Sequence, residues 1–238
     1  MNNNNNNSYS LSIRFSSGGF SLYAYDENNN LLSSRTESEE LFSKSKEEII
    51  EILSKIDELN LNFRNVRIIL ETEIYSILPI AVYTPENEFH LLKLHHSNIT
   101  HDDKILTNEL TAWDAILIFS VPGQLHAVLS EIAPEVSIEH HIPAFINDYV
   151  ELENDKNVNV WLRSNHMDVV VLEKWNLIFI NSFEFKTDED FIYFILKVYE
   201  KLELETEQCG LKIHNVKKRT SLTDLASKYI KNCSFTQN

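Results

Sequence analysis

The chain has 238 residues, 43% of them hydrophobic and 11% aromatic, which is ample for a buried core. Its formal net charge is −15, with 9 basic and 22 acidic side chains in residues 1–150 against 12 and 14 in residues 151–238. Because phosphate neutralisation needs clustered Lys and Arg, this composition argues against nucleic acid as a partner.

The amino terminus and the cysteines bear on where the protein acts. Asn2–Asn7 is an asparagine tract, and we expect residues 1–7 to be a disordered tail. The start lacks the basic and apolar regions of a signal peptide, and no run reaches the ~18 apolar residues of a membrane span. Cys209 and Cys233 are too few for a disulfide framework and lack metal-site spacing. We therefore expect a soluble cytoplasmic protein without membrane insertion.

Three segments of period-two patterning open the chain, at Tyr9–Phe15, Phe20–Tyr25 and Leu31–Thr36. Short turns separate them, which predicts an antiparallel meander. Lys46–Leu59 follows with apolar residues at helical spacing. Val66–Leu70 is a continuous apolar run, which after a helix predicts a strand added in parallel to the same sheet.

The middle of the chain departs from this scheme. We expect an inserted subdomain at about residues 72–110, with a helix in Pro85–Leu94 and a strand in Lys104–Leu110. Ala115–Ser120 is again typical of a buried strand, and Pro143–Leu152 of a helix.

Residues 157–202 repeat the order of the opening. Strands are expected at Val158–Leu162, Met167–Glu173 and Leu177–Phe185, and a helix after Thr187. The run FIYFIL in this helix is apolar nearly all round, which predicts a helix buried on two sides.

The repeated order indicates a duplication. We expect a first lobe over residues 8–152, which carries the insertion, and a second lobe over residues 153–238. Alternating strands and helices predict an α/β fold. Each lobe should hold a three-stranded antiparallel meander, extended by parallel strands and flanked by helices.

This arrangement resembles the actin-like ATPase (ribonuclease H-like) fold of actin, Hsp70 and the bacterial actin-like proteins of cell division and pilus assembly. The segment IFSVPGQLHAVLSEIAPEVSIEHHIPAF, residues Ile118–Phe145, is similar to the strand, Pro-started helix, second strand and Pro-Ala helix of that superfamily. The chain also resembles an uncharacterised bacterial family of about this length. The likeness spans nearly the whole chain and rests on pattern and order, with few identities.

The resemblance implies a phosphate loop at the first hairpin of each lobe, with glycines for close backbone approach and an Asp for the metal. In the first hairpin Arg14 stands about where the acidic residue is expected. The turn consists of Ser16, Ser17, Gly18 and Gly19. We interpret it as an ordinary hairpin turn, with anion binding as the alternative.

In the second hairpin Trp161 stands about where the Asp is expected. Arg163, Ser164 and Asn165 occupy the glycine positions, and only Asp168 matches the pattern. We interpret this loop as a solvated turn, with contact between Arg163 and a phosphate as the alternative.

The rest of the nucleotide machinery is also reduced. Asn215-Val216 stands where the resemblance implies a glycine pair beside the adenosine, and the chain has only 4 glycines. The carboxylates that could serve a metal are Asp168, Glu71 and Glu73. We expect neither a cofactor nor a metal.

Two further groups of side chains are candidate binding sites, one rich in histidine and one basic. His95, His96 and His101, with Asp102 and Asp103, are metal-ligand types, but their spacing matches no metal motif and we interpret them as surface residues.

The second group is basic. Lys217, Lys218 and Arg219 form a cluster that is either a solvated loop or a binding site for an acidic partner. No Ser or Cys carries the signature of a nucleophile.

We therefore expect a non-catalytic pseudo-ATPase that acts as a protein-interaction or scaffold module. Its protein partner is not identified by the sequence, and a homodimer is one state open to it. A nucleotide-binding ATPase with divergent loops is the first alternative, and a small-molecule sensor that uses the interlobe cleft is the second.

Overall fold

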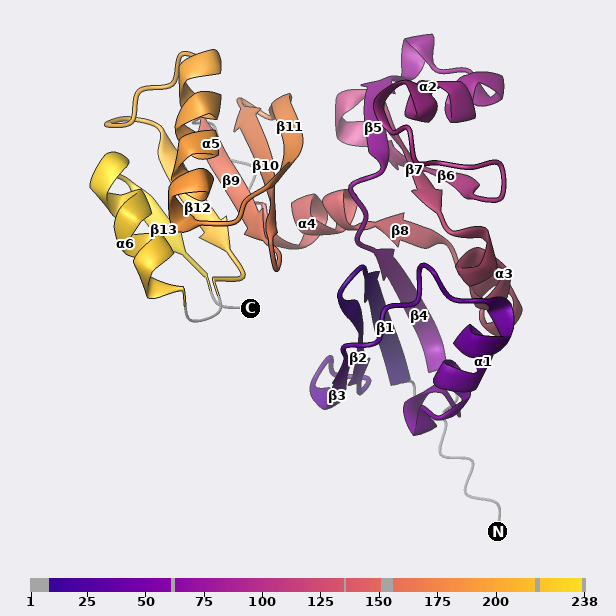
Figure 1. Ribbon diagram of the computed structural model, residues 1–238. Coiled ribbons are helices and arrows are strands. Elements are labelled where there is room, and N and C mark those ends of the chain that lie inside the picture. Colours follow the sequence, from indigo (N-terminus) through magenta and orange to yellow (C-terminus); the bar gives the residue numbers. More distant parts are fainter. Residues whose placement is uncertain (1–8, 61–62, 135, 151–155, 217–218, 237–238) are drawn as a thin grey trace. The chain divides into compact units, whose positions relative to one another are not determined.

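The structure is a computed structural model, and the chain divides into two compact units, Met1–Ala144 and Phe145–Asn238 (Figure 1). The expected tail over residues 1–7 and the expected lobe boundary after residue 152 lie outside the described residues. No helix in the described part of the chain is long and apolar enough to span a membrane. The described residues are 9–60, 63–134, 136–150, 156–216 and 219–236.

A five-stranded mixed sheet forms the centre of the first unit, in the order β3-β2-β1-β4-β8. Its strands are β1 (Tyr9–Ser16), β2 (Gly19–Tyr25), β3 (Leu31–Glu37), β4 (Phe63–Leu70) and β8 (Ile138–His140). The first three pair antiparallel, whereas β4 and β8 add in parallel. Buried side chains alternate with half-buried ones along β1, so one face of the sheet lies on the core.

The second unit holds a sheet of the order β11-β10-β9-β12-β13. Its strands are β9 (Asn157–Leu162), β10 (His166–Glu173), β11 (Asn176–Glu184), β12 (Gly210–His214) and β13 (Cys233–Phe235). Position by position this is the order of the first sheet, and the strand directions also agree. The duplicated α/β architecture predicted from the sequence is therefore confirmed.

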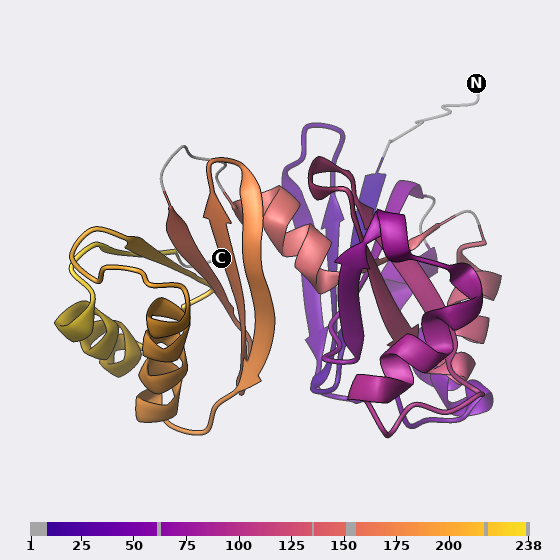
Figure 2. The same cartoon turned by 90° about the horizontal axis from the view of Figure 1, so that it is seen from above.

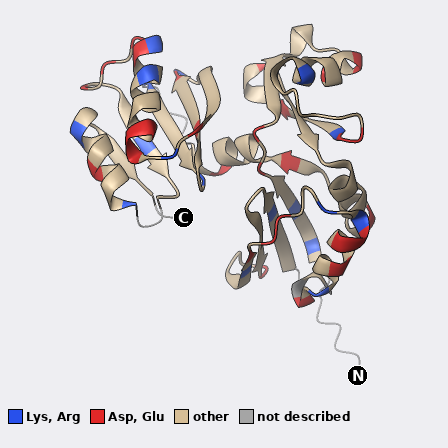
Figure 3. Ribbon diagram, in the orientation of Figure 1, with Lys and Arg blue, Asp and Glu red and all other residues tan. Residues whose placement is uncertain are grey.

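Two helices cover one face of each sheet (Figure 2): α1 (Lys46–Ser54) and α3 (Gly123–Ile132) in the first unit, α5 (Asp188–Lys201) and α6 (Thr220–Tyr229) in the second. Both α1 and α5 begin with a reciprocal capping box, in which hydroxyl and carboxylate each accept a backbone N–H. Figure 3 shows the acidic start of α5, which suits the positive end of the helix. The pairs are Ser45 with Glu48, and Thr187 with Asp190.

α5 packs on the sheet and against α6, and its remaining face is exposed. Phe191, Ile195 and Val198 are buried, whereas Tyr193 is 56% exposed. The prediction of a helix buried on two sides holds for the sides on the sheet and on α6, but not for the side that carries Tyr193. The ring of Tyr193 points away from the sheet, with the Lys197 ammonium 6.0 Å from its centroid. A tyrosine within an apolar run of the sequence can therefore be exposed to solvent, because its hydroxyl group is polar.

A smaller antiparallel sheet of the order β5-β7-β6 belongs to the first unit. It consists of β5 (Tyr75–Pro79), β6 (Lys104–Leu110) and β7 (Ala115–Val121), with α2 (Glu88–His95) packed against β7. β7 is buried along its whole length and is the central strand. The sheet therefore continues past residue 110, where the sequence placed the end of the insertion.

The remaining elements are short. α4 (His141–Tyr149) follows β8 directly. The 3-10 turns are Asp57–Asn60, Ile80–Val82, Pro85–Asn87 and Thr111–Trp113.

Candidate functional site

The β1–β2 hairpin is closed by a two-residue loop, Ser17-Gly18, between the paired residues Ser16 and Gly19. The Ser16 Oγ donates to the Gly19 carbonyl oxygen at 3.0 Å and accepts from the Gly18 N–H at 3.3 Å. Gly19 has φ +125°, and a Cβ there would lie 2.0 Å from the carbonyl oxygen of Glu37. The glycine is thus required by the close approach of β3, which is a packing reason.

Arg14 stands one residue before the last buried position of β1, on the sheet face opposite α1 and α3. Its Nη1 donates to the Glu71 Oε1 at 2.9 Å, and the two side chains are 22% and 13% exposed. On the same face, Arg67 of β4 donates to Glu139 of β8 at 2.7 Å. Glu71 was one of the few carboxylates available to a metal, and here it accepts from an arginine.

The β9–β10 hairpin contains a buried ion pair. The Arg163 Nε and Nη2 donate to the two carboxylate oxygens of Asp168, each at 2.9 Å, and the Ser182 Oγ donates to the same carboxylate at 2.6 Å. The side chain of Asp168 is 0% exposed and that of Arg163 is 8% exposed. The interpretation of Arg163 as part of a solvated turn is wrong, because its guanidinium neutralises the one carboxylate that matched the phosphate-loop pattern.

The loop of this hairpin, Ser164-Asn165, is contacted by Arg219. Its Nη2 donates to the Ser164 carbonyl oxygen, and its guanidinium carbon lies 5.4 Å from the ring centroid of Phe185. Lys217 and Lys218, the other members of the basic cluster, lie outside the described residues. A role of this cluster in partner binding stays a prediction.

An aromatic cluster surrounds Trp161 of β9, the position at which the resemblance implies an Asp for the metal. Trp161 is buried, with its ring centroid 5.5 Å from that of Phe145 and 4.7 Å from that of Tyr149, both on α4. His214, at the end of β12, lies edge-on to Phe145 at 5.4 Å. Where the resemblance implies an acidic residue, the structure has a large apolar ring held by two others.

The loop after β12 keeps a glycine-like backbone without glycine. Asn215 has φ +63°, in the left-handed region that Asn tolerates better than most residues. Its Nδ2 donates to the Leu162 carbonyl oxygen at 2.7 Å, which ties this loop to the end of β9.

The histidines around α2 have structural contacts. The His96 Nε2 lies 3.0 Å from the Tyr75 carbonyl oxygen, and His101 stacks on Phe89 with 4.2 Å between ring centroids. No three His, Cys, Asp or Glu side chains converge as a metal site within the described ranges.

These residues do not fit a magnesium nucleotide. A metal-bound phosphate needs free carboxylates and approachable backbone N–H groups. In the second hairpin Asp168 is saturated by Arg163 and Ser182. In the first, the close backbone approach at Gly19 is taken by β3.

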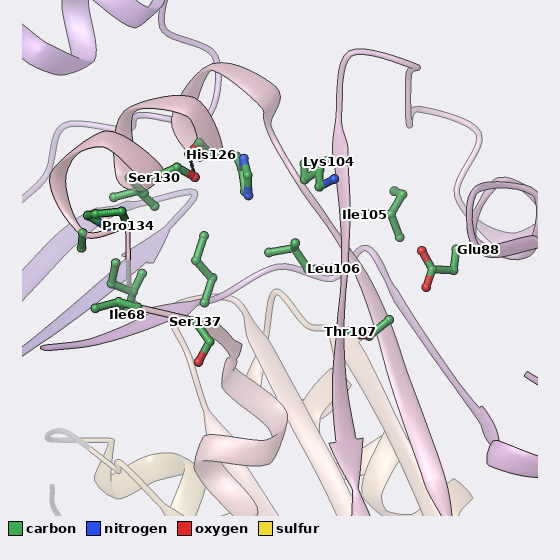
Figure 4. Close-up of a pocket in the computed structure, with 14 residues that line it drawn as sticks. Ile68, Glu88, Lys104, Ile105, Leu106, Thr107, His126, Ser130, Pro134 and Ser137 are labelled. Atoms are coloured by element: carbon green, nitrogen blue, oxygen red, sulfur yellow. Dashed lines mark hydrogen bonds between the residues drawn. The ribbon is translucent and has the colours of Figure 1, made fainter. Parts of the chain in front are cut away.

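A pocket of about 390 Å³ opens elsewhere, between α3, β6 and β8 of the first unit (Figure 4). Its floor is apolar, and Lys104 and His126 lie at one end. Burial, and then the charge of Lys104, lower the pKa of His126. No sequence pattern indicated this pocket, because none shows which strand edges face each other. The apolar floor includes Ile68, Leu106, Leu129 and Ile138.

Comparison with known proteins gives a family and a fold. A family model described as "Protein of unknown function (DUF3822)" matches residues 1–233. A Bacteroides thetaiotaomicron protein with actin-like ATPase fold and unknown function is 23% identical, with a TM-score of 0.84 over 100% of this chain and 94% of that one. A chain of the PilM–PilN type IV pilus biogenesis complex is 11% identical, with a TM-score of 0.53 over 98% of this chain and 88% of that one. No curated protein matches the sequence. The actin-like ATPase fold expected from the resemblance is confirmed.

Proposed function

The chain belongs to this family of proteins of unknown function (DUF3822), and we propose that it is a non-catalytic actin-like protein which acts by binding another protein. The proposal treats the scaffold as retained and the nucleotide chemistry as lost. The cytosol is its proposed place of action, which the free thiols of Cys209 and Cys233 support.

The observation that carries the proposal is the Arg163–Asp168 pair. A buried carboxylate with an arginine on both oxygens cannot also hold a metal unless the arginine leaves, and breaking such a buried pair costs several kcal/mol. The resemblance makes this hairpin a phosphate loop, so its only matching carboxylate is committed to an internal contact.

Two further observations support the same proposal. Trp161 fills the position at which an acidic residue is expected, and Arg14 does so in the other hairpin. A protein of similar fold, the chain of the PilM–PilN complex, is part of a protein–protein assembly. This supports the proposal that the present chain also binds a protein.

Calorimetric titration with Mg-ATP and Mg-ADP at millimolar nucleotide tests the proposal. We expect no binding heat and no shift in melting temperature. A dissociation constant below ~100 μM, equivalent to more than roughly 5.5 kcal/mol, would overturn it and favour the nucleotide-binding ATPase.

The variant Arg163→Ala serves as the matched comparison. It frees Asp168 but leaves Trp161 in place, so we expect it to remain unable to bind Mg-ATP. Capture of partners from native extract, with and without ATP depletion, completes the test. The same protein should be captured under both conditions, and capture that depends on ATP would contradict the proposal.

A further inference from the structure

The wall of the pocket on the β6 side is the edge of a strand. Four consecutive residues, Lys104 to Thr107, line the pocket, although successive side chains of a strand point to opposite faces. Figure 4 shows Lys104 and Leu106 on one side of β6, and Ile105 and Thr107 on the other. A wall built by both sets is the backbone edge, and β6 is the outermost strand of its sheet.

The pairing of β7 fixes which backbone groups of β6 face outward. The Ser120 N–H donates to the Ile74 carbonyl oxygen, on the side of β7 away from β6. Ile105 lies opposite Ser120, so this pair does not exchange hydrogen bonds. The N–H and C=O of Ile105, and of Thr107 two residues on, therefore point away from β7 toward the pocket.

The opposite wall belongs to a second sheet edge. β8 is the outermost strand of the larger sheet of this unit, and its residue Ile138 lines the pocket. At one end Asn108 bridges the two edges: its Nδ2 donates to the Ile138 carbonyl oxygen at 3.3 Å, and its Oδ1 accepts the His140 N–H at 2.7 Å. A side-chain amide thus already makes, across this gap, the hydrogen bonds that a peptide group would make.

Two basic side chains, Lys104 and His126, lie at one end of the pocket, whereas the Glu88 carboxylate lies on the other side of β6 (Figure 4). In the part of the chain that the structure describes, the Lys104 ammonium has no ion pair with a carboxylate, and burial, followed by the charge of Lys104, lowers the pKa of His126. The exposed Lys104 ammonium, which has no carboxylate partner there, favours an incoming anion. The apolar floor of the pocket favours an aliphatic side chain.

We propose that this pocket binds an extended acidic segment of a partner protein, which adds a strand to β6 and places a carboxylate beside Lys104 and His126. Backbone hydrogen bonds to Ile105 and Thr107 supply affinity, and an aliphatic side chain on the floor supplies specificity. This rests on the proposed function, since it names the kind of partner that the protein binds.

The test is selection of random twelve-residue peptides, displayed on phage, against the full chain. We expect acidic sequences with alternating aliphatic residues to be enriched, and calorimetry to show that they bind the purified protein. Absence of enriched sequences would overturn the proposal.

Two matched pairs of variants locate the site. Thr107→Pro removes an outward N–H from an edge position that tolerates proline, whereas Thr107→Ala keeps it. Lys104→Glu reverses the charge in the pocket, whereas Lys55→Glu makes the same change at the exposed C-cap of α1. We expect T107P and K104E each to weaken peptide binding at least tenfold, and T107A and K55E to bind as the parent chain does.

Melting temperatures establish that each variant is folded. If T107P is not folded, the binding of peptides to K104E decides the outcome. Enriched peptides that bind K104E as well as the parent chain would overturn the proposal. If K104E and T107P still capture the partner from native extract while peptide binding is lost, this inference fails and the proposed function stands. If Mg-ATP binds, the proposed function fails regardless of the peptides.

Discussion

The β1–β2 and β9–β10 hairpins hold equivalent places in two sheets of the same strand order, and both close with two-residue loops. In the first, Gly19 presses against the backbone of β3, and Arg14 forms a half-buried ion pair. In the second, His166 stands where Gly19 does, and an ion pair joins Arg163, which is nearly buried, to the fully buried Asp168. The same backbone frame is thus held by close backbone packing in one unit and by a desolvated charge pair in the other.

The largest expected effect comes from Asp168→Asn. It leaves Arg163 buried without its counter-charge, which should lower the free energy of unfolding by about 3–5 kcal/mol. The matched change in the other hairpin, Glu71→Gln, should cost only about 1 kcal/mol, because that pair is partly exposed. Urea unfolding of both variants measures the difference.

A double variant separates loss of the charge from loss of the pair. Arg163→Met with Asp168→Leu leaves neither charge alone, so it should be more stable than Asp168→Asn. Equal costs for Asp168→Asn and Glu71→Gln would mean that burial does not distinguish the two hairpins.

Gly19→Ala should have the next largest effect, on the order of 2–3 kcal/mol. The new Cβ would meet the Glu37 carbonyl oxygen at 2.0 Å, in a backbone conformation that suits glycine. Gly18→Ala is the control, because the nearest atom to its Cβ is 3.8 Å away. Thermal unfolding compares the two, and a similar melting temperature for both would contradict the packing role of Gly19.

The smallest expected effect concerns a feature that the two units share, their capped helices. The backbone N–H of Lys186, then that of Thr187, lowers the pKa of Asp190, and the backbone N–H of Ser45 lowers that of Glu48. The folded pKa lies below the unfolded one, so these carboxylates stabilise the fold above the unfolded pKa. That contribution is lost as the pH falls through the folded pKa.

Melting temperatures between about pH 6 and pH 2.5 test this effect. Asp190→Asn and Glu48→Gln should each be less stable near neutral pH and lose less stability on acidification than the parent chain. Glu47→Gln, in the first turn of α1 but outside the cap, is the control. Parallel curves for all four proteins would refute the capping contribution.

The sequence predicted those parts of the fold that depend on local pattern. Period-two patterning located the three antiparallel strands of each sheet to within about one residue, and the strand expected at Lys104–Leu110 coincides with β6. It failed at Tyr193, because an aromatic residue in an apolar run can still face water.

The site features required contacts that a pattern does not contain. The opposite charges of Arg163 and Asp168 around a two-residue loop were a signal for this pair. Arg163 flanks the loop opposite His166, and Asp168, two residues beyond His166, is its diagonal neighbour on the same face of the hairpin. No such signal indicated that the edges of β6 and β8 face each other. Asn108 bridges two different sheets, and only the folded structure shows that these sheets are neighbours.

The equal length of the two hairpin loops has a consequence for the history of the chain. After a gene duplication, two loops of unequal length would have required an insertion or deletion, which shifts strand register and is rarely tolerated inside a sheet. Here the frames match, so the divergence between Ser16 and Arg163, or between Gly19 and His166, required only codon substitutions. Each step could be tested by selection on a folded protein, and ancestral sequences of this lineage should differ in side chains at these turns while keeping the number of residues.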